Sequence, residues 1–364
     1  MCVQLDQGTT MSEKESKLTF WYDDLEGDDF NLVGKKNANL GEMIKAGIRV
    51  SPGFALSLHA NDLFLEETGI KAELKQYLEQ LGEVDYDSCK AASEFAVQRI
   101  ERAEVPSIIA DEVRREYQKL CAMANVVDVP VAVRSSGAVS MPGQMETYLN
   151  IRGEQDLIHY IKKTWASAYH VEAITYRMNK GLGFLLNIGV GIPKMVNSRL
   201  SGVVFTLNPL NGDPSKISVD ISYGLGEAVV SGLVTPDNYL VDKITLGVVH
   251  RTMGMKESMC VYREGGSDID TVPVPEDDRN RYCSTPEELE EICRISKSID
   301  KYYGKRYDIE FGVDADLPFP ENVIILQVRP ESVWSKKKAE AKAAKKKDAM
   351  DRIVSQLITG VRVK

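Results

Sequence analysis

Three residues in the C-terminal half have the types and spacing to bind a metal ion and phosphate. In the stretch YDIEFGVDADLPFPENVIILQVRPES, Glu310 lies on one predicted strand, and Gln327 and Arg329 lie on the next. Side chains alternate faces along a strand, so pairing across the Pro-containing turn would bring Glu310 and Gln327 together with Arg329 beside them. Carboxylate and amide oxygens suit Mg²⁺, and a guanidinium binds phosphate in a bidentate fashion. A surface salt bridge on a solvated sheet is the competing interpretation.

Two further segments could contact phosphate groups. In VAVRSSGAVSMPGQMETYLN, a predicted buried strand ends near Arg134 and is followed by small residues whose N–H groups could face a phosphate. In LVGKKNANLGEM, Lys36 lies at the start of a predicted helix, without the spacing of a P-loop. Taken singly, an ordinary turn is the default interpretation of the first segment, and a solvated lysine is that of the second. The glycines of SYGLGEAVVSG lack the third position of a dinucleotide fingerprint, which excludes a Rossmann interpretation.

Composition excludes several other classes of protein. The 364 residues carry a net charge of -9, and the basic run KKKAEAKAAKKK makes the rest more acidic still, so we expect no nucleic-acid binding. No apolar run approaches the roughly 20 residues of a membrane span, and the N-terminus has no secretory pattern, so we expect a cytoplasmic protein without membrane contact. The six cysteines and four histidines lack zinc or metallohydrolase spacing.

The pattern of elements predicts a mixed α/β protein of the α+β type. Helical spacing dominates to about residue 125, a short buried strand covers 129–136, and strands dominate after about residue 195. One helix interrupts these strands, with Ser284 or Thr285 as its cap, Pro286 in its first turn and Gly304 as its end. Two lobes that meet at a cleft would explain this distribution, and such clefts commonly bind small molecules.

The two ends of the sequence differ from the body. Residues 1–16 are polar and without periodicity, which predicts a disordered lead-in. Residues 335–364 read as a basic linker followed by an amphipathic helix, whose apolar stripe runs from Met350 to Val361. That stripe either folds back on its own chain or contacts another subunit, and the sequence does not choose between the two.

In their order along the chain, these segments resemble the nucleotide-binding part of the phosphoenolpyruvate synthase and pyruvate, phosphate dikinase family. The resemblance covers roughly residues 18–334. It depends on the blocks GKKNANLGEM, VRSSGAVSMPGQMETYLN, ITYRMNKG, SGVVFTLNP, GLGEAVVSGLVTPDNY, DIEFGV and LQVRPES. It implies an ATP-grasp fold with an N-terminal lobe at 17–195, a C-terminal lobe at 196–334 and a nucleotide cleft between them.

The resemblance also assigns roles at the phosphate end of that cleft. It makes Lys36, Arg134 and Arg329 catalytic residues that contact the phosphates of ATP. It makes Glu310 and Gln327 the pair that binds Mg²⁺, with Mn²⁺ as an alternative metal.

Other roles concern the covering loop and the adenine. The resemblance places Gly143 and Thr147 in the loop over the phosphates, and Met195 in a hinge, KMV, that offers backbone groups to adenine. Two positions depart from the family pattern: Lys35 replaces a glycine, and Pro193 replaces a glutamine before the hinge.

The implied reaction transfers the pyrophosphoryl group of ATP to a histidine and leaves AMP and phosphate. No histidine lies in the expected sequence context, so we expect a histidine-bearing partner subunit that also carries the small-molecule acceptor. The main hypothesis is an ATP-binding subunit like that of phenylphosphate synthase, with phenol as acceptor. The alternatives are the nucleotide-binding portion of a phosphoenolpyruvate synthase (pyruvate, water dikinase), a rifampin-type phosphotransferase, and a non-catalytic ATP-sensing module.

Overall fold

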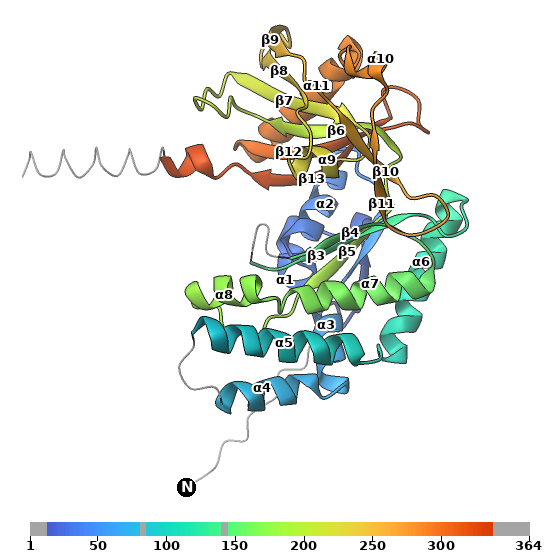
Figure 1. The fold of residues 1–364 in the computed structure, drawn as a ribbon, viewed down its shortest axis with the longest axis vertical. Helices are drawn as coiled ribbons and strands as arrows, with labels where there is room; N and C mark the ends of the chain where they lie inside the picture. The colour runs from blue at the N-terminus through green and yellow to red at the C-terminus, as the bar shows by residue number, and fades with distance from the viewer. Residues whose placement is uncertain (1–12, 81–84, 140–144, 338–364) are drawn as a thin grey trace, which may run out of the picture.

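The computed structural model describes residues 13–80, 85–139 and 145–337, and each of its two α/β lobes contains one large antiparallel sheet (Figure 1). The first sheet has the order β1-β2-β5-β3-β4, and the second has the order β13-β12-β6-β7-β8-β9. The strands of the first sheet are β1 (Thr19–Trp21), β2 (Gly53–Leu56), β3 (Val131–Ser136), β4 (Thr147–Ile151) and β5 (Gly189–Pro193). Those of the second are β6 (Ser198–Phe205), β7 (Lys216–Tyr223), β8 (Asp237–Asp242), β9 (Val248–Thr252), β12 (Tyr307–Asp314) and β13 (Val323–Pro330).

Helices cover the first sheet on the side away from the second lobe. They are α3 (Leu58–Glu67), α4 (Ile70–Gln80), α5 (Tyr86–Arg102), α6 (Ser107–Ala124), α7 (Glu154–Ser167) and α8 (Val171–Asn179). Their apolar stripes bury one core, in which the ring of Trp165 on α7 stacks on Phe64 of α3 with centroids 4.9 Å apart. The helices α4 and α5 form the outermost layer (Figure 1).

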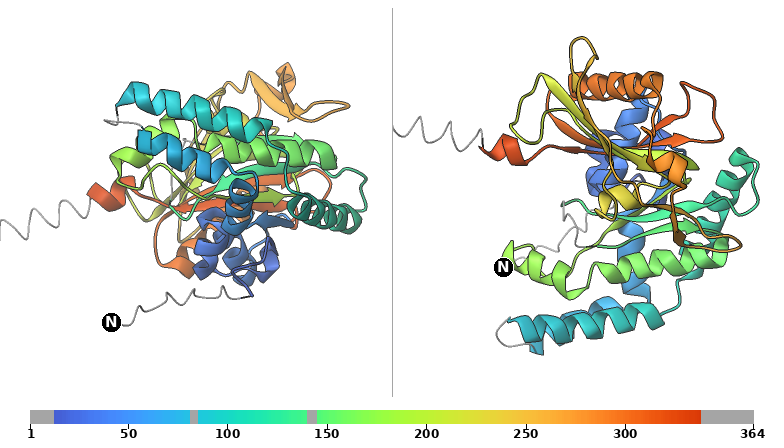
Figure 2. Two further views of the ribbon diagram at one scale, coloured as in Figure 1. Left: turned by 90° about the horizontal axis from the view of Figure 1, so that it is seen from below. Right: turned by 45° about the horizontal axis from the view of Figure 1, so that its top comes forward.

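The helix predicted between the strands of the second lobe is α11 (Pro286–Tyr303), and its predicted ends are confirmed. The Thr285 hydroxyl accepts from the Glu288 N–H, the Glu288 side chain returns to the Thr285 N–H, and Gly304 ends the helix with φ 63°. Its buried face, including Ile292 and Ile299, packs on the second sheet opposite the first lobe (Figure 2). Two short helices, α9 (Glu227–Val230) and α10 (Glu276–Arg279), complete this lobe.

The N-terminal segment joins the two lobes. It contains the 3-10 turns η1 (Tyr22–Asp24) and η2 (Gly27–Asp29) and the helices α1 (Phe30–Val33) and α2 (Lys35–Lys45). Helix α2 contacts β3 and β5 of one sheet and β13 of the other, and Met43 shares a core with Phe311 and Ile325. The boundary at 195/196 therefore stays a prediction, although β5 and β6 lie on either side of it.

A separate hairpin also crosses between the lobes. It consists of β10 (Ser258–Tyr262) and β11 (Ile269–Pro273), and it descends from the second lobe toward β4 (Figure 1). Asn150 of β4, at φ 56°, donates from Nδ2 to the carbonyls of Gly266 and Asp268, at 3.1 and 2.7 Å. The Tyr262 hydroxyl donates to the Val196 carbonyl at 2.8 Å, which ties the hairpin to the connection between the lobes.

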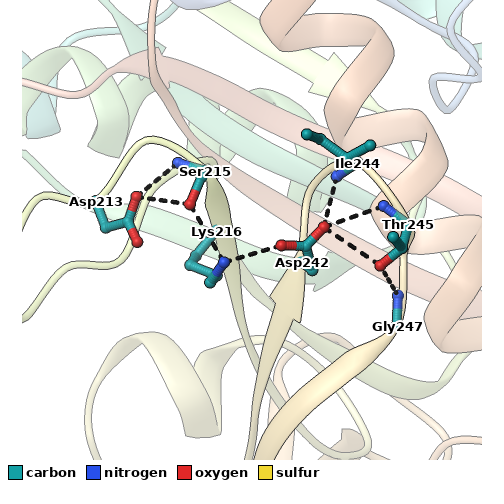
Figure 3. A network of polar contacts seen from close by, with 7 residues as sticks. All are labelled: Asp213, Ser215, Lys216, Asp242, Ile244, Thr245 and Gly247. Atoms are coloured by element: carbon teal, nitrogen blue, oxygen red, sulfur yellow. Dashed lines mark hydrogen bonds and ion pairs between the residues drawn. The ribbon is translucent and has the colours of Figure 1, made fainter.

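The outer edge of the second sheet is fixed by a polar network (Figure 3). Lys216 of β7 donates to Asp242 of β8 at 2.9 Å, and the other oxygen of that carboxylate accepts from the N–H groups of Ile244 and Thr245. The Lys216 ammonium, followed by these N–H groups, holds the pKa of Asp242 well below its usual range. The network closes the turn into β9.

The strand predicted at 129–136 is confirmed as β3, but the other four strands of the first lobe were not predicted. Strands dominate after residue 195 as predicted, although β10 and β11 were not foreseen, and the region before 125, predicted to be helical, also contains β1 and β2. The residues of β2, GFAL, are buried on both faces, so they show none of the polar alternation that identifies a strand. Residues 1–12 and 338–364, with most of the predicted lead-in and tail helix, lie outside the described residues. Within the described part, no helix is long and apolar enough to cross a membrane.

Candidate active site

A cleft of about 820 Å³ lies between the two sheets, and the predicted site residues converge on it. The described site residues that line it are Lys36, Arg134, Thr147, Met195, Glu310, Gln327 and Arg329. They come from α2, β3, β4, the connection between β5 and β6, β12 and β13. The eighth predicted residue, Gly143, lies outside the described residues.

The predicted pairing of Glu310 and Gln327 is confirmed. The two residues lie directly opposite each other on β12 and β13, and Gln327 Nε2 donates to Glu310 Oε1 at 2.8 Å. This contact uses one carboxylate oxygen and the amide nitrogen, which leaves Glu310 Oε2 and Gln327 Oε1 for a cation. Both side chains are half-buried in the cleft wall.

This pair fits Mg²⁺ bound together with a phosphate ligand. Mg²⁺ is commonly held by one or two protein oxygens, with substrate phosphates and water in its remaining positions. Among the described residues no three or more His, Cys, Asp or Glu side chains gather as a metal cage. The two oxygens therefore provide part of a coordination shell, and the rest would come from the ligand.

Arg329 is only partly engaged by the salt bridge that the competing interpretation predicted. It lies opposite Asp308, and its Nε donates to Asp308 Oδ2 at 3.1 Å. Burial raises the pKa of Asp308, and the Arg329 charge opposes that shift. The Arg329 side chain is 57% exposed, and neither Nη nitrogen has a partner in the described part of the chain. These nitrogens remain free to bind an anion in the cleft.

Lys36 and Arg134 form a cationic wall opposite this hairpin. The start of α2 abuts the end of β3, because Lys35 N donates to the Gly137 carbonyl at 3.0 Å and Gly34 takes a φ of 81°. A Cβ at Gly34 would lie 2.0 Å from the Ser136 carbonyl, so this close approach requires glycine.

The cationic wall carries a positive charge that protein groups do not fully balance. Lys36 opens onto the cleft while protein surrounds it on its other sides, and this desolvation lowers its pKa. The Arg134 charge lowers it further, Glu310 opposes the shift, and Arg329 adds to it. Arg134 itself donates from Nη1 to the Leu326 carbonyl at 3.4 Å and has no carboxylate partner among the described residues. A bound polyanion would balance the positive charge at the end of the cleft that holds Lys36 and Arg134.

The opposite end of the cleft is apolar and offers free backbone groups. Ala132, Leu149, Met195 and Leu225 line it, and they belong to a cluster built from both lobes. The Met195 N–H is taken by the Pro130 carbonyl, but the Met195 carbonyl accepts only a contact of 3.5 Å from Lys194 Nζ. The Val196 N–H has no partner in the described chain. A flat heterocycle with a donor and an acceptor on one edge would suit this end.

Sequence reasoning passed over one acidic residue of the cleft. Glu227, the first residue of α9, lines the cavity together with Gly226. The segment GLGEAVVSG was rejected as a dinucleotide motif, and the family block that contains it gave Glu227 no role. The signal that could have found Glu227 is its position directly after Gly226, in a segment with two glycines that follows a buried strand. Glycines at such a place let the backbone approach another group closely, and the carboxylate then lies beside that contact.

Comparison with known proteins identifies the family. Residues 30–350 match the family described as pyruvate phosphate dikinase, AMP/ATP-binding domain. The chain belongs to this family. The chain is therefore a dikinase nucleotide-binding domain, and the description of its family supports ATP binding.

The curated relatives of this dikinase domain are phosphoenolpyruvate synthases. The probable enzyme of Staphylothermus marinus is 37% identical over 94% of this chain and 45% of its own length. The enzyme of Aeropyrum pernix is 34% identical over 90% of this chain and 44% of its own length. That of Neisseria meningitidis serogroup B is 36% identical over 86% of this chain and 42% of its own length. The chain thus spans less than half the length of these relatives. Their names favour the phosphoenolpyruvate synthase alternative over phenylphosphate synthase.

One solved structure that matches this chain superposes on it only loosely. The ADP complex of N5-carboxyaminoimidazole ribonucleotide synthetase covers 68% of this chain and 58% of its own, with 8% identity and a TM-score of 0.26. An overlap this slight carries no weight for function.

Proposed function

We propose that this chain is the nucleotide-binding part of a phosphoenolpyruvate synthase, which phosphorylates pyruvate at the expense of ATP. The observation that carries the proposal is the convergence of Lys36, Arg134 and Arg329 around the Glu310–Gln327 pair at one end of the cleft. The names of the relatives support pyruvate as the acceptor. The phenylphosphate synthase hypothesis has no comparable support.

In this proposal the cleft binds ATP along its length. The adenine lies at the apolar end, where the Met195 carbonyl and the Val196 N–H are available. The triphosphate lies on the cationic wall, and Thr147 lines the cleft next to it. Mg²⁺, or Mn²⁺, held by Glu310 and Gln327 would neutralise phosphate charge when bound.

The proposed catalysis is mainly positioning and charge neutralisation. A histidine nitrogen attacks the β-phosphorus of ATP. The bond between that phosphorus and the oxygen that bridges it to the α-phosphorus breaks, and AMP leaves with the electron pair. Water then cleaves the γ-phosphate from the histidine-bound pyrophosphoryl group. Lys36, Arg134 and Arg329 hold the phosphates in line and balance the charge that shifts during transfer.

The acceptor histidine would come from a separate subunit or domain. The four histidines, His59, His159, His170 and His250, are all described, and none of them lines the cleft. We therefore propose that a histidine-bearing module supplies the acceptor and carries pyruvate in its own site.

The test is label transfer from ATP carrying radioactive phosphorus at the β-position. The chain is mixed with Mg²⁺, labelled ATP and the histidine-bearing module of a phosphoenolpyruvate synthase relative. We expect label on histidine, release of AMP, and faster AMP release with pyruvate than with phenol. Arg329→Ala should abolish transfer while leaving the circular dichroism spectrum unchanged. Preference for phenol would restore the phenylphosphate synthase hypothesis, and nucleotide binding without AMP would indicate a sensing module.

A further inference from the structure

Two buried polar atoms behind the cationic wall lack a hydrogen bond of ordinary geometry among the described residues. They are the hydroxyl of Tyr22, which is fully buried in η1, and Nε of Arg134 on β3. Buried polar atoms in folded proteins nearly always bond to protein or to ordered water. Two such atoms that face the same place therefore indicate a ligand between them.

Both residues line a small space of about 10 Å³ behind the cleft. Lys36, Asn37 and Gly191 line it too. A buried water needs roughly 10–15 Å³ and two to four polar partners. The space is therefore large enough for one water molecule and for nothing larger.

The backbone of β5 creates this space. Gly191 lies directly opposite Arg134, and a Cβ at Gly191 would lie 3.0 Å from the Tyr22 hydroxyl and 2.3 Å from Asn37 Oδ1. Tyr22 and Asn37 thus converge on the volume that a side chain at 191 would fill. Asn37 Nδ2 donates to the Val33 carbonyl at 2.8 Å, which leaves Oδ1 as an acceptor facing the space.

We propose that one water molecule bridges the Tyr22 hydroxyl, Asn37 Oδ1 and Arg134 Nε, and that Tyr22 is a positioning residue for the Arg134 guanidinium. The water accepts from Arg134 Nε–H and from the Tyr22 O–H, and it donates to Asn37 Oδ1. With Nη1 on the Leu326 carbonyl, Arg134 is then held at two nitrogens, and Nη2 is left for phosphate.

The electrostatics agree with these donor and acceptor roles. Burial raises the pKa of Tyr22, and the Arg134 charge and a contact from the Ile192 N–H to the hydroxyl oxygen oppose that shift only in part, so the hydroxyl keeps its proton and can donate. The consequence for ATP rests on the function proposed above, because it requires that Arg134 contacts a phosphate.

A crystal structure of the free protein and one conservative variant test the bridge. We expect density for a water within hydrogen-bonding distance of both Tyr22 and Arg134. Tyr22→Phe should weaken Mg·ATP binding in calorimetry by about tenfold, equivalent to ~1.4 kcal/mol. The matched control is Tyr169→Phe, a buried tyrosine whose hydroxyl donates to the Leu186 carbonyl at 3.5 Å in the first-lobe core, and it should leave binding unchanged.

A double-mutant cycle separates positioning from general stability. Arg134→Lys removes the Nε–H donor, because lysine has no counterpart of it at this place. In urea unfolding, the effect of Tyr22→Phe on the unfolding constant should therefore be smaller by about threefold or more in the Arg134→Lys background than in the wild type. Three results would each overturn the bridge: a crystal structure without density for the water, unfolding costs of the two substitutions that add in the double mutant, or equal effects of Tyr22→Phe and Tyr169→Phe on Mg·ATP binding. Failure of the wild type to bind Mg·ATP would instead overturn the proposed function, since the density and the cycle are measured without nucleotide.

Discussion

Replacing Lys36 by methionine should weaken ATP binding and at the same time stabilise the free protein. Lys36 faces the cleft beside Arg134 and Arg329, and its pKa is lowered chiefly by desolvation and next by the Arg134 charge. A hydrogen bond from lysine to phosphate is worth about 1.5–3 kcal/mol, so its loss should weaken Mg·ATP binding by about 10- to 150-fold.

The gain in stability follows from the relief of repulsion among the three cations. Because Lys36 is open to solvent on its cleft side, screening limits this gain to about 1 kcal/mol or less, or about 2 °C in Tm. Such opposed changes are typical of a residue kept for binding rather than for folding. The control is Lys45→Met at the other end of α2, where Lys45 pairs with Glu26 on the surface, and it should change neither affinity nor Tm appreciably.

Calorimetry with a non-hydrolysable ATP analogue and differential scanning fluorimetry measure the two effects. The pH dependence adds a third: a bound polyanion restores the lysine pKa, so binding takes up a proton and wild-type affinity falls as pH rises through the lowered pKa. Lys36→Met should lack this alkaline fall. A variant that loses stability, or that binds as tightly as the wild type, would refute the assignment of Lys36 to the phosphate site.

Three further predictions concern the metal pair and the second lobe. Glu310→Gln should raise the Mg²⁺ concentration needed for half-maximal nucleotide binding by at least about tenfold, since it removes the charged ligand, and metal titrations at fixed ATP would show this. Lys256→Met should destabilise the protein by about 3–5 kcal/mol in urea unfolding, because it leaves the fully buried Asp237 carboxylate, 2.5 Å from Lys256 Nζ, without its counter-charge. Burial raises the pKa of Asp220, and the hydrogen bond from Asn238 opposes this shift, so ionisation of Asp220 costs stability as the pH rises through and above the ordinary Asp range. Asp220→Asn should therefore be more stable than the wild type by about 0.5–1 kcal/mol at neutral pH, and the difference should vanish in acid.

The hairpin that carries Glu310 and Gln327 could be predicted from the sequence because its information is local. Two strands, a short turn and the alternation of side chains suffice to bring Glu310 opposite Gln327. The shift in register between Glu310 and Phe311 could not be foreseen, since a bulge depends on how β13 pairs further along.

The cationic wall could not be predicted from local patterns. Lys36 and Arg134 lie on separate elements of the chain, and only the ordered resemblance to a family placed both at one site. The strand β2 of the first sheet was missed because its residues are buried on both faces and read like helix or loop. The contacts of Asn150 with the β10–β11 hairpin depend on a left-handed backbone at an ordinary residue, which leaves no clear trace in the sequence.

The central claim is that the hairpin of β12 and β13 and the cationic wall together bind metal-complexed ATP. Anomalous diffraction from crystals grown with Mn²⁺ and a non-hydrolysable ATP analogue tests it most directly. The account predicts a manganese peak about 2.2 Å from a Glu310 oxygen, phosphates against Lys36 and Arg329, and the adenine beside Met195. A peak remote from Glu310, or a nucleotide bound outside the cleft, would contradict it.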